Sequence, residues 1–267
     1  MIDLHCHLLP GIDDGAPDLA TSLRMARIAA EDGIAVVACT PHIYPGLYDN
    51  AGLAIRRAVQ ELQARIGEAN IALRLTHGAD IHLVPNLAKG LGDGRLPSLH
   101  DSRYFLLEPP HHVAPPRLKE TVFELLTGGY IPIITHPERL TWIEDHYEIF
   151  VELVHRGAWL QITAGSLTGR FGTTARYWGE RLLDEGLVHI LATDSHDVDR
   201  RPPLLAEGRR AAERWVGTTE ACHLVETRPQ GILDDTQPER LPAALTFQSA
   251  KPARGGRSWW KRLLGLG

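Results

Sequence analysis

Seven short apolar segments rich in β-branched residues recur along the chain, separated by stretches with the spacing of an amphipathic helix. The segments are residues 2–6, 34–40, 72–80, 103–108, 130–136, 158–164 and 187–194. Strands that alternate with helices in this way build an α/β fold, with a parallel sheet and the helices outside it. About seven such units in 267 residues favour a distorted seven-stranded (β/α)7 TIM-like barrel.

The stretches between these segments place apolar residues three or four positions apart, which predicts helices. The clearest examples run over residues 19–29 and 53–66, with others around 122–126 and 149–153. C-cap glycines are expected between helix and strand at Gly33, Gly129, Gly157 and Gly186. A doubly wound nucleotide-binding fold is disfavoured, because HCHLLPG follows the first segment in place of a glycine-rich fingerprint.

The pattern divides the chain into a barrel domain over 1–234 and a different segment over 235–267. The final stretch, KPARGGRSWWKRLLGLG, carries five basic residues and no acidic ones. We expect 235–267 to be a disordered basic tail. The alternative is a short basic and aromatic element that contacts an anionic membrane surface or a protein partner.

The charge, the cysteine count and the N-terminal sequence narrow down the cellular compartment of the protein and the kinds of partner it can bind. The formal net charge of −5 gives no reason to expect a nucleic-acid partner. The N-terminal MIDLHCH lacks the basic and apolar regions of a signal peptide, and no apolar run is long enough to span a bilayer. Three cysteines are too few, and odd in number, for a disulfide framework. We therefore expect a cytoplasmic protein.

Side chains that can bind metal follow most of the predicted strands at their carboxyl ends. In chain order these are His5, His7, His42, Asp80, Glu108, His136, Asp194 and His196. Sites in barrels form at this rim from several strand ends at once, so we expect these side chains to converge. His5 and His7 are two positions apart and share a face, whereas Cys6 points away and packs. One of Asp13 and Asp14 is expected to join them.

Single members of this set also have simpler explanations. Glu108 could pair with a buried cation, Asp80 could cap a helix, and His42 and His136 could order turns beside prolines. The other nine histidines are interpreted as structural or exposed: His77, His82, His100, His111, His112, His146, His155, His189 and His223. The set as a whole is more specific than its members, because ligand-type residues at most strand ends are hard to obtain by chance.

The ligand types indicate the chemistry. Imidazole and carboxylate without thiolate suit Mn, Fe, Zn or Mg, and about nine ligands exceed what one ion takes. Two or three divalent ions are therefore expected, and they suit phosphoester hydrolysis because metals activate water and stabilise the attacking and leaving oxygens. Guanidinium groups bind phosphate oxygens in bidentate fashion. Arg139 and either Arg200 or Arg201 are placed for this, although Arg139 could instead pair with Glu138.

Seven motifs together resemble the polymerase and histidinol phosphatase (PHP) superfamily. Within it, the chain resembles the bacterial metal-dependent protein-tyrosine phosphatases encoded with capsular and extracellular polysaccharide genes. The motifs are DLHCHLLPGIDDGA (3–16), CTPH (39–42), GADIHL (78–83), LLEPP (106–110), THPER (135–139), ITAGSLTGRFG (162–172) and ATDSHDVDRRPP (192–203). The resemblance covers roughly residues 1–230 and implies a distorted seven-stranded barrel with a trinuclear metal site.

The resemblance also implies a role for individual residues. The three metals would be held by His5, His7, Asp80 and Asp194, by Asp80, Glu108 and His136, and by Asp14, His42 and His196. Arg139 and Arg201 match phosphate-binding arginines, and Mn²⁺ is the expected metal, with Fe, Zn or Mg as alternatives. The implied partner is a phosphotyrosine protein, a membrane-associated tyrosine kinase that controls polysaccharide synthesis. Asp80 departs from the usual Glu and is one methylene shorter, which affects metal spacing or occupancy.

Two other functions remain open from the sequence. The same site could serve a small-molecule phosphatase of the histidinol-phosphate type, or a non-catalytic metal-bearing regulatory module. A cysteine-dependent mechanism is disfavoured: Cys222 to Arg228 formally matches the C-x5-R signature of cysteine-dependent tyrosine phosphatases, but it contains no glycine and the segment is predicted to be helical.

Overall fold

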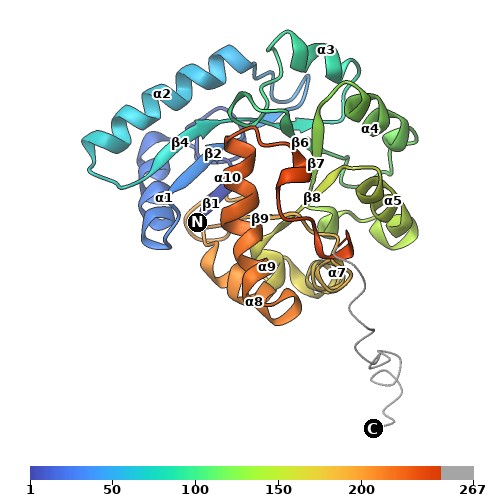
Figure 1. Cartoon of the computed structure of the whole chain (residues 1–267). Helices are drawn as coiled ribbons and strands as arrows, with labels where there is room; N and C mark the ends of the chain where they lie inside the picture. The colour runs from blue at the N-terminus through green and yellow to red at the C-terminus, as the bar shows by residue number, and fades with distance from the viewer. Residues whose placement is uncertain (248–267) are drawn as a thin grey trace.

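The computed structural model describes residues 1–247 and consists of parallel strands surrounded by helices (Figure 1). The strands are β1 (Ile2–Cys6), β2 (Val36–Cys39), β3 (His42–Ile43), β4 (Arg74–His77), β5 (Asp80–His82), β6 (Tyr104–Glu108), β7 (Ile131–Thr135), β8 (Trp159–Thr163) and β9 (Ile190–Ala192). The helices are α1 (Leu19–Glu31), α2 (Gly52–Glu68), α3 (Leu87–Gly92), α4 (Leu118–Thr127), α5 (Ile143–His155), α6 (Ala164–Leu167), α7 (Gly172–Asp184), α8 (Ala206–Val216), α9 (Thr218–Cys222) and α10 (Arg228–Leu233).

Among the described residues the strands form two parallel sheets, in the orders β1-β2-β4 and β3-β5-β6-β7-β8-β9. The α/β class and the parallel arrangement are confirmed, and every expected segment contains a strand. The expected count of seven strands is corrected to nine within the described residues, because the short strands β3 and β5 follow β2 and β4 closely along the chain. β2 and β3 are separated at Pro41, which cannot donate to a sheet, and β4 and β5 are separated at Gly78 and Ala79.

At one seam the two sheets share chain segments, because β2 leads directly into β3 and β4 into β5, and hydrogen bonds keep these segments paired through the breaks. The amide of Asp80 donates to the carbonyl of Pro41 at 3.1 Å, and the amide of Gly78 donates to the carbonyl of Cys39 at 3.1 Å. A Cβ at Gly78 would lie 2.7 Å from a methyl of Leu99, so the packing of Leu99 against the break favours glycine. At the other seam, Cys6 pairs in parallel with Ser195 just after β9.

The predicted helices are present, and their buried faces follow the expected spacing. In α1 the side chain of Asp18 accepts a hydrogen bond from the amide of Thr21 at 2.7 Å, which caps the helix, and Met25, Ala26 and Ala29 face the core. The four predicted C-cap glycines have φ between +72° and +106°, the left-handed region that ends helices.

Alternation along the strands creates an inner and an outer apolar layer. Ile2 and Leu4 pack in a cluster with inward side chains of the other strands and with Ile232 of α10, whereas Cys6 packs in the outer cluster beneath the helices. The pairing of β1 with β2 shifts register between Asp3 and Cys6. Such a bulge re-aims side chains, so β1 contributes apolar residues at its start and His5 at its end.

Residues 235–247 contact the rest of the domain. The hydroxyl of Tyr104 donates to the carbonyl of Thr236 at 2.8 Å, and the buried guanidinium of Arg228 donates to the carbonyls of Pro242 and Ala243 at 2.7 and 2.9 Å. The rest of the predicted tail, 248–267, lies outside the described residues. The boundary at 234/235 stays a prediction. No helix within 1–247 has the length and apolar character needed to cross a membrane.

Candidate metal centre

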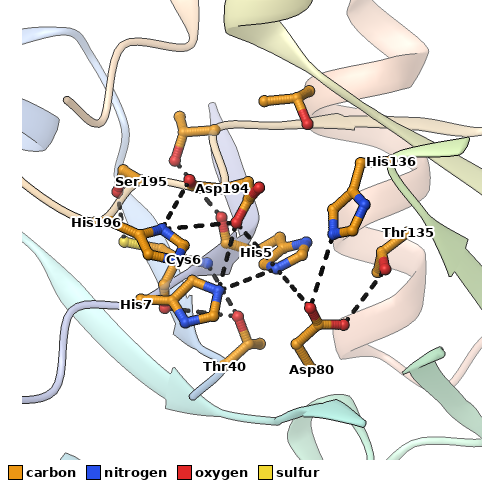
Figure 2. A network of polar contacts seen from close by, with 12 residues as sticks. His5, Cys6, His7, Thr40, Asp80, Thr135, His136, Asp194, Ser195 and His196 are labelled. Atoms are coloured by element: carbon orange, nitrogen blue, oxygen red, sulfur yellow. Dashed lines mark hydrogen bonds and ion pairs between the residues drawn. The ribbon is translucent and has the colours of Figure 1, made fainter. Parts of the chain in front are cut away.

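The predicted ligands come together around the carboxyl ends of the strands, and most are buried. Figure 2 shows His5, His7, Asp80, His136, Asp194 and His196 of this set. His5 ends β1, Asp80 begins β5, Glu108 ends β6, and His136 follows β7. His7, Asp14, His42, Asp194 and His196 join them from β3 and from the segments after β1 and β9. Parallel strands deliver their carboxyl ends to one rim, which explains why residues far apart in sequence meet here.

The centre of the cluster is formed by His5, His7 and Asp194. The two Nε2 atoms of His5 and His7 lie 3.2 Å apart, as expected for side chains on one face. Each lies 3.3 Å from Oδ1 of Asp194, and Nε2 of His5 lies 3.4 Å from Oδ2 of Asp80. Four ligand atoms of the first predicted metal site therefore converge on one small volume.

Asp80 connects this group to a second one. Its Oδ2 lies 3.8 Å from Nε2 of His136 and 3.6 Å from Nδ1 of His42. Glu108 contacts both histidines, with Oε1 3.8 Å from Nε2 of His136 and Oε2 3.2 Å from Nδ1 of His42. The Asp80 carboxylate thus occupies the position that a bridging ligand would need, despite being shorter than glutamate.

A third group lies where the cluster opens to solvent. Oδ1 of Asp14 is 3.5 Å from Nε2 of His42 and 3.4 Å from Nε2 of His196. His7 also belongs to this group, because its ring centroid is 3.9 Å from that of His196. The two adjacent aspartates have different partners. The Asp14 carboxylate lies beside His42 and His196 in this third group, whereas the Asp13 carboxylate accepts a hydrogen bond from Nδ1 of His7.

The polar atoms of the cluster fit divalent cations. Within residues 1–247, Oδ2 of Asp80 and Nδ1 of His136 are buried and have no hydrogen-bond partner. Burial alone would lower the pKa of His5, yet the carboxylates of Asp194 and Asp80 raise it to about 9. Buried carboxylates and unpaired imidazole nitrogens are costly without a compensating charge, and these donor types suit Mn, Fe, Zn or Mg.

A second layer of polar groups orients the histidines. Nδ1 of His7 donates to Oδ2 of Asp13 at 2.7 Å, Nδ1 of His5 to Oε1 of Gln161 at 3.0 Å, and Nδ1 of His196 to the carbonyl of Asp194 at 3.1 Å. In each ring Nε2 then points into the cluster, the arrangement seen for histidine ligands.

Two arginines contact the cluster from one side. Nη1 of Arg139 and Nη2 of Arg201 both donate to Oδ2 of Asp194. Arg139 and Arg201 also lie over the ring of Phe171, with Cζ 4.5 and 5.6 Å from its centroid. The backbone amides of Arg200 and Arg201 both donate to Asp197, but the Arg200 side chain is exposed and the Arg201 guanidinium contacts Asp194, so Arg201 is the member of the pair that faces the site.

Glu138 is not the partner of Arg139. Its Oε1 accepts hydrogen bonds from the amide of Thr163 at 2.9 Å and from the hydroxyl of Ser166 at 2.8 Å. This buried carboxylate links the turn after β7 to the end of β8 and leaves Arg139 available to the metal centre.

Sequence reasoning missed two further histidines beside the cluster. Nδ1 of His82 lies 3.6 Å from Oε2 of Glu108, and Nε2 of His111 lies 3.8 Å from Oε1 of the same residue. The His111 ring is stacked on His136, with 5.0 Å between centroids. The sequence offered only their spacing from proposed ligands as a sign of this position: His82 is two residues beyond Asp80, and His111 is three residues beyond Glu108.

Cys222 lies outside this arrangement. It ends α9, and residues 223–227 continue as a π-helical turn, which confirms the prediction of a helix. Its thiol donates to Oε2 of Glu226 at 3.4 Å, and burial raises the thiol pKa. A helical cysteine with a raised pKa lacks the phosphate-cradling loop that cysteine-dependent phosphatases need.

Residues 1–234 match the capsular polysaccharide synthesis family CpsB/CapC. The chain belongs to the CpsB/CapC family. It is 39% identical over 226 residues to tyrosine-protein phosphatase YwqE of Bacillus subtilis (strain 168), covering 85% of this chain and 89% of YwqE. It is 26% identical to tyrosine-protein phosphatase CpsB of Streptococcus pneumoniae, covering 88% of this chain and 99% of CpsB. The family expected from the motifs is confirmed.

Solved structures agree with this membership. One from a study of YwqE from Bacillus subtilis and CpsB from Streptococcus pneumoniae, described as unique metal-dependent tyrosine phosphatases, has a TM-score of 0.85 and 36% identity. It covers 89% of this chain and 96% of its own. A probable 2-pyrone-4,6-dicarboxylic acid hydrolase from Acinetobacter baumannii, at 17% identity and a TM-score of 0.53, is similar in fold alone.

Proposed function

We propose that this chain is a metal-dependent phosphomonoesterase that acts on phosphotyrosine in proteins. The observation that carries this proposal is the meeting of nine ligand-type side chains with two arginines at Asp194. The relatives named as tyrosine-protein phosphatases support phosphotyrosine as the substrate class.

Three ion positions account for the three groups of side chains. We assign the first to His5, His7, Asp80 and Asp194, the second to Asp80, Glu108 and His136, and the third to Asp14, His42 and His196. The donors are nitrogen and oxygen only, and we propose Mn²⁺ as the ion, with Fe, Zn or Mg as alternatives. Such ions, when bound, lower the pKa of water and neutralise charge on phosphoryl oxygens.

The residues of the chain have separable tasks in this mechanism. Arg139 and Arg201 bind phosphoryl oxygens, and their shared contact with Asp194 and Phe171 keeps both guanidinium groups oriented before substrate arrives. Asp13 holds the proton of His7 on Nδ1 and so keeps Nε2 available as a ligand.

We propose that the two sheets act together as one distorted barrel of seven β/α units. The hydrogen bonds from Asp80 to Pro41 and from Gly78 to Cys39, with the Cys6–Ser195 pairing at the other seam, support this interpretation. Residues 1–234 are proposed to be the catalytic domain, the range that matches the family.

The physiological substrate we propose is a membrane-associated tyrosine kinase that regulates capsular or extracellular polysaccharide synthesis. The family description supports a role in capsular polysaccharide synthesis. The predicted cytoplasmic location and the membrane contact of the tail stay predictions.

The test is phosphate release by the purified chain from a phosphotyrosine peptide and, in parallel, from histidinol phosphate. We expect turnover of the peptide with Mn²⁺, loss of turnover after chelation, and recovery when Mn²⁺ is restored. Turnover of histidinol phosphate alone would indicate the small-molecule phosphatase. Metal binding without turnover of either substrate would indicate the regulatory module.

A further inference from the structure

Two adjoining cavities lie at the open side of the metal centre. The first, of about 360 Å³, is lined by Asp14, His42 and Glu108 and also by Leu47 and Val113. The second, of about 640 Å³, extends away from the cluster, and its walls include Ile43, Tyr44, Tyr48, Val84, Pro85 and Leu96. We call the second cavity the side groove. Both volumes are in the range of ligand-binding pockets.

The cavities share three wall residues, so the side groove adjoins the first cavity, which reaches the metal centre. Tyr44, Tyr48 and His82 line both. The Tyr44 ring stacks on His82 with 4.0 Å between centroids, and the Tyr48 ring stacks on His42 at 5.7 Å. The backbones of Tyr44 and Tyr48 are joined by two hydrogen bonds of 3.0 and 2.7 Å. Ring stacking and backbone hydrogen bonds therefore hold the shared wall in place.

The entrance to these cavities is apolar. Seven large hydrophobic side chains are exposed among residues 1–247, and three of them, Tyr44, Leu47 and Val113, line the first cavity. Apart from Asp49, Asn50, His82 and Arg95, the side groove is lined by apolar or aromatic residues. Exposed apolar surface gathered around a polar cleft is typical of a binding site.

We propose that the side groove binds the substrate segment next to the phosphotyrosine and selects for apolar side chains in it. The first cavity exposes three of the proposed ligands, Asp14, His42 and Glu108, so a substrate whose phosphate reaches them from this side carries its chain past the adjoining side groove. The groove offers that chain an apolar surface. This inference rests on the proposed phosphatase function and adds a sequence preference to it.

The preference can be measured with a set of phosphotyrosine peptides. One set carries Leu or Val within three positions on either side of the phosphotyrosine, and a matched set carries Ser there. Burial of one such side chain contributes roughly 1.5–3 kcal/mol, or about 10- to 100-fold in kcat/KM. We expect the Mn²⁺-loaded protein to favour the apolar peptides by a factor in this range.

Matched variants locate the preference in the side groove. Val84 lines the groove and Val151 lies on α5, and both are partly buried against the same core. Val84→Ser should reduce the preference for apolar peptides several-fold, and Val151→Ser should not. Leu47→Ser and Leu53→Ser form a second pair, equally exposed at 63%, that tests the first cavity, which Leu47 lines. Leu47→Ser should lower the ratio of peptide kcat/KM to that of para-nitrophenyl phosphate, and Leu53→Ser should not.

The outcomes separate this inference from the function on which it rests. Hydrolysis of para-nitrophenyl phosphate and of all peptides at equal efficiency would refute the proposed role of the side groove in selecting substrates. It would leave the phosphatase function intact. A preference for apolar peptides that persists in Val84→Ser would overturn the proposed role of the side groove as well. No hydrolysis of any phosphotyrosine substrate by the Mn²⁺-loaded protein would overturn both proposals.

Discussion

Asp13 offers a sharp test of how the metal centre is organised, because it is adjacent to a proposed ligand without being one. Its carboxylate accepts from Nδ1 of the fully buried His7 at 2.7 Å and from the amide of His42 at 3.1 Å. Asp13→Asn keeps an acceptor oxygen and removes the charge. A hydrogen bond to a charged group contributes about 1.5–3 kcal/mol and a neutral one about 0.5–1.5 kcal/mol. We therefore expect a loss of about 1–2 kcal/mol in metal binding, or roughly 5- to 30-fold in affinity.

The measurement is a calorimetric titration of metal-free protein with Mn²⁺. Asp49→Asn is the control, because Asp49 also accepts a backbone hydrogen bond, from Gly46 at 2.9 Å, but it is exposed and outside the metal cluster. The control should bind Mn²⁺ with wild-type affinity. If Asp13→Asn is folded and binds all its metal as tightly as the wild type, the idea that Asp13 orients His7 for metal is refuted.

Three further predictions follow from the site and the core. Arg139→Lys should lower kcat/KM for a phosphotyrosine peptide about 100-fold, because lysine cannot form the bidentate contact, while Arg200→Lys should change it less than twofold. Cys222→Ser should keep full activity; loss of turnover in the folded variant would overturn the metal mechanism. Burial and the nearby Arg228 lower the pKa of His189 to about 3, so its stabilising contribution is complete above pH ~6.5 and declines as the pH falls toward 3. Between pH 6.5 and 5 this lowers the free energy of unfolding by about 2 kcal/mol. Urea titrations at the two pH values should show this loss in the wild type and should not show it in His189→Gln.

The positions of most strands and helices could be predicted from the sequence, because apolar residues recur with different periods in strands and helices and because glycines mark the helix ends. The short strands β3 and β5 were not, since two or three residues carry no readable alternation. Their presence depends on the break at Pro41 and on the close approach of Leu99 to Gly78, which are tertiary features. The ordered contacts of residues 235–247 were also hidden, because they are made largely through backbone carbonyls.

The meeting of the proposed ligands was predictable because parallel strands end at one rim. The separate positions of Asp13 and Asp14 were not, since adjacent residues in a turn point in directions that only the backbone sets. Glu138 was considered a partner of Arg139 from sequence proximity, but two donors from the β8 end compete for its carboxylate. His111 was set aside because the loop after Glu108 has no periodicity that would predict its position.

The pairing of Cys6 with Ser195 has a consequence for the order in which the protein matures. His5 and His7 emerge early in synthesis, yet the Asp194 carboxylate that they contact is made almost 190 residues later. Contacts of such long sequence separation form late in folding, because closing the intervening chain costs entropy before the contact stabilises it. The proposed metal centre combines both ends of the domain and can therefore be completed only after β9 has docked beside β1. A nascent chain lacking β9 would present an incomplete set of ligands to the cell's metal pool.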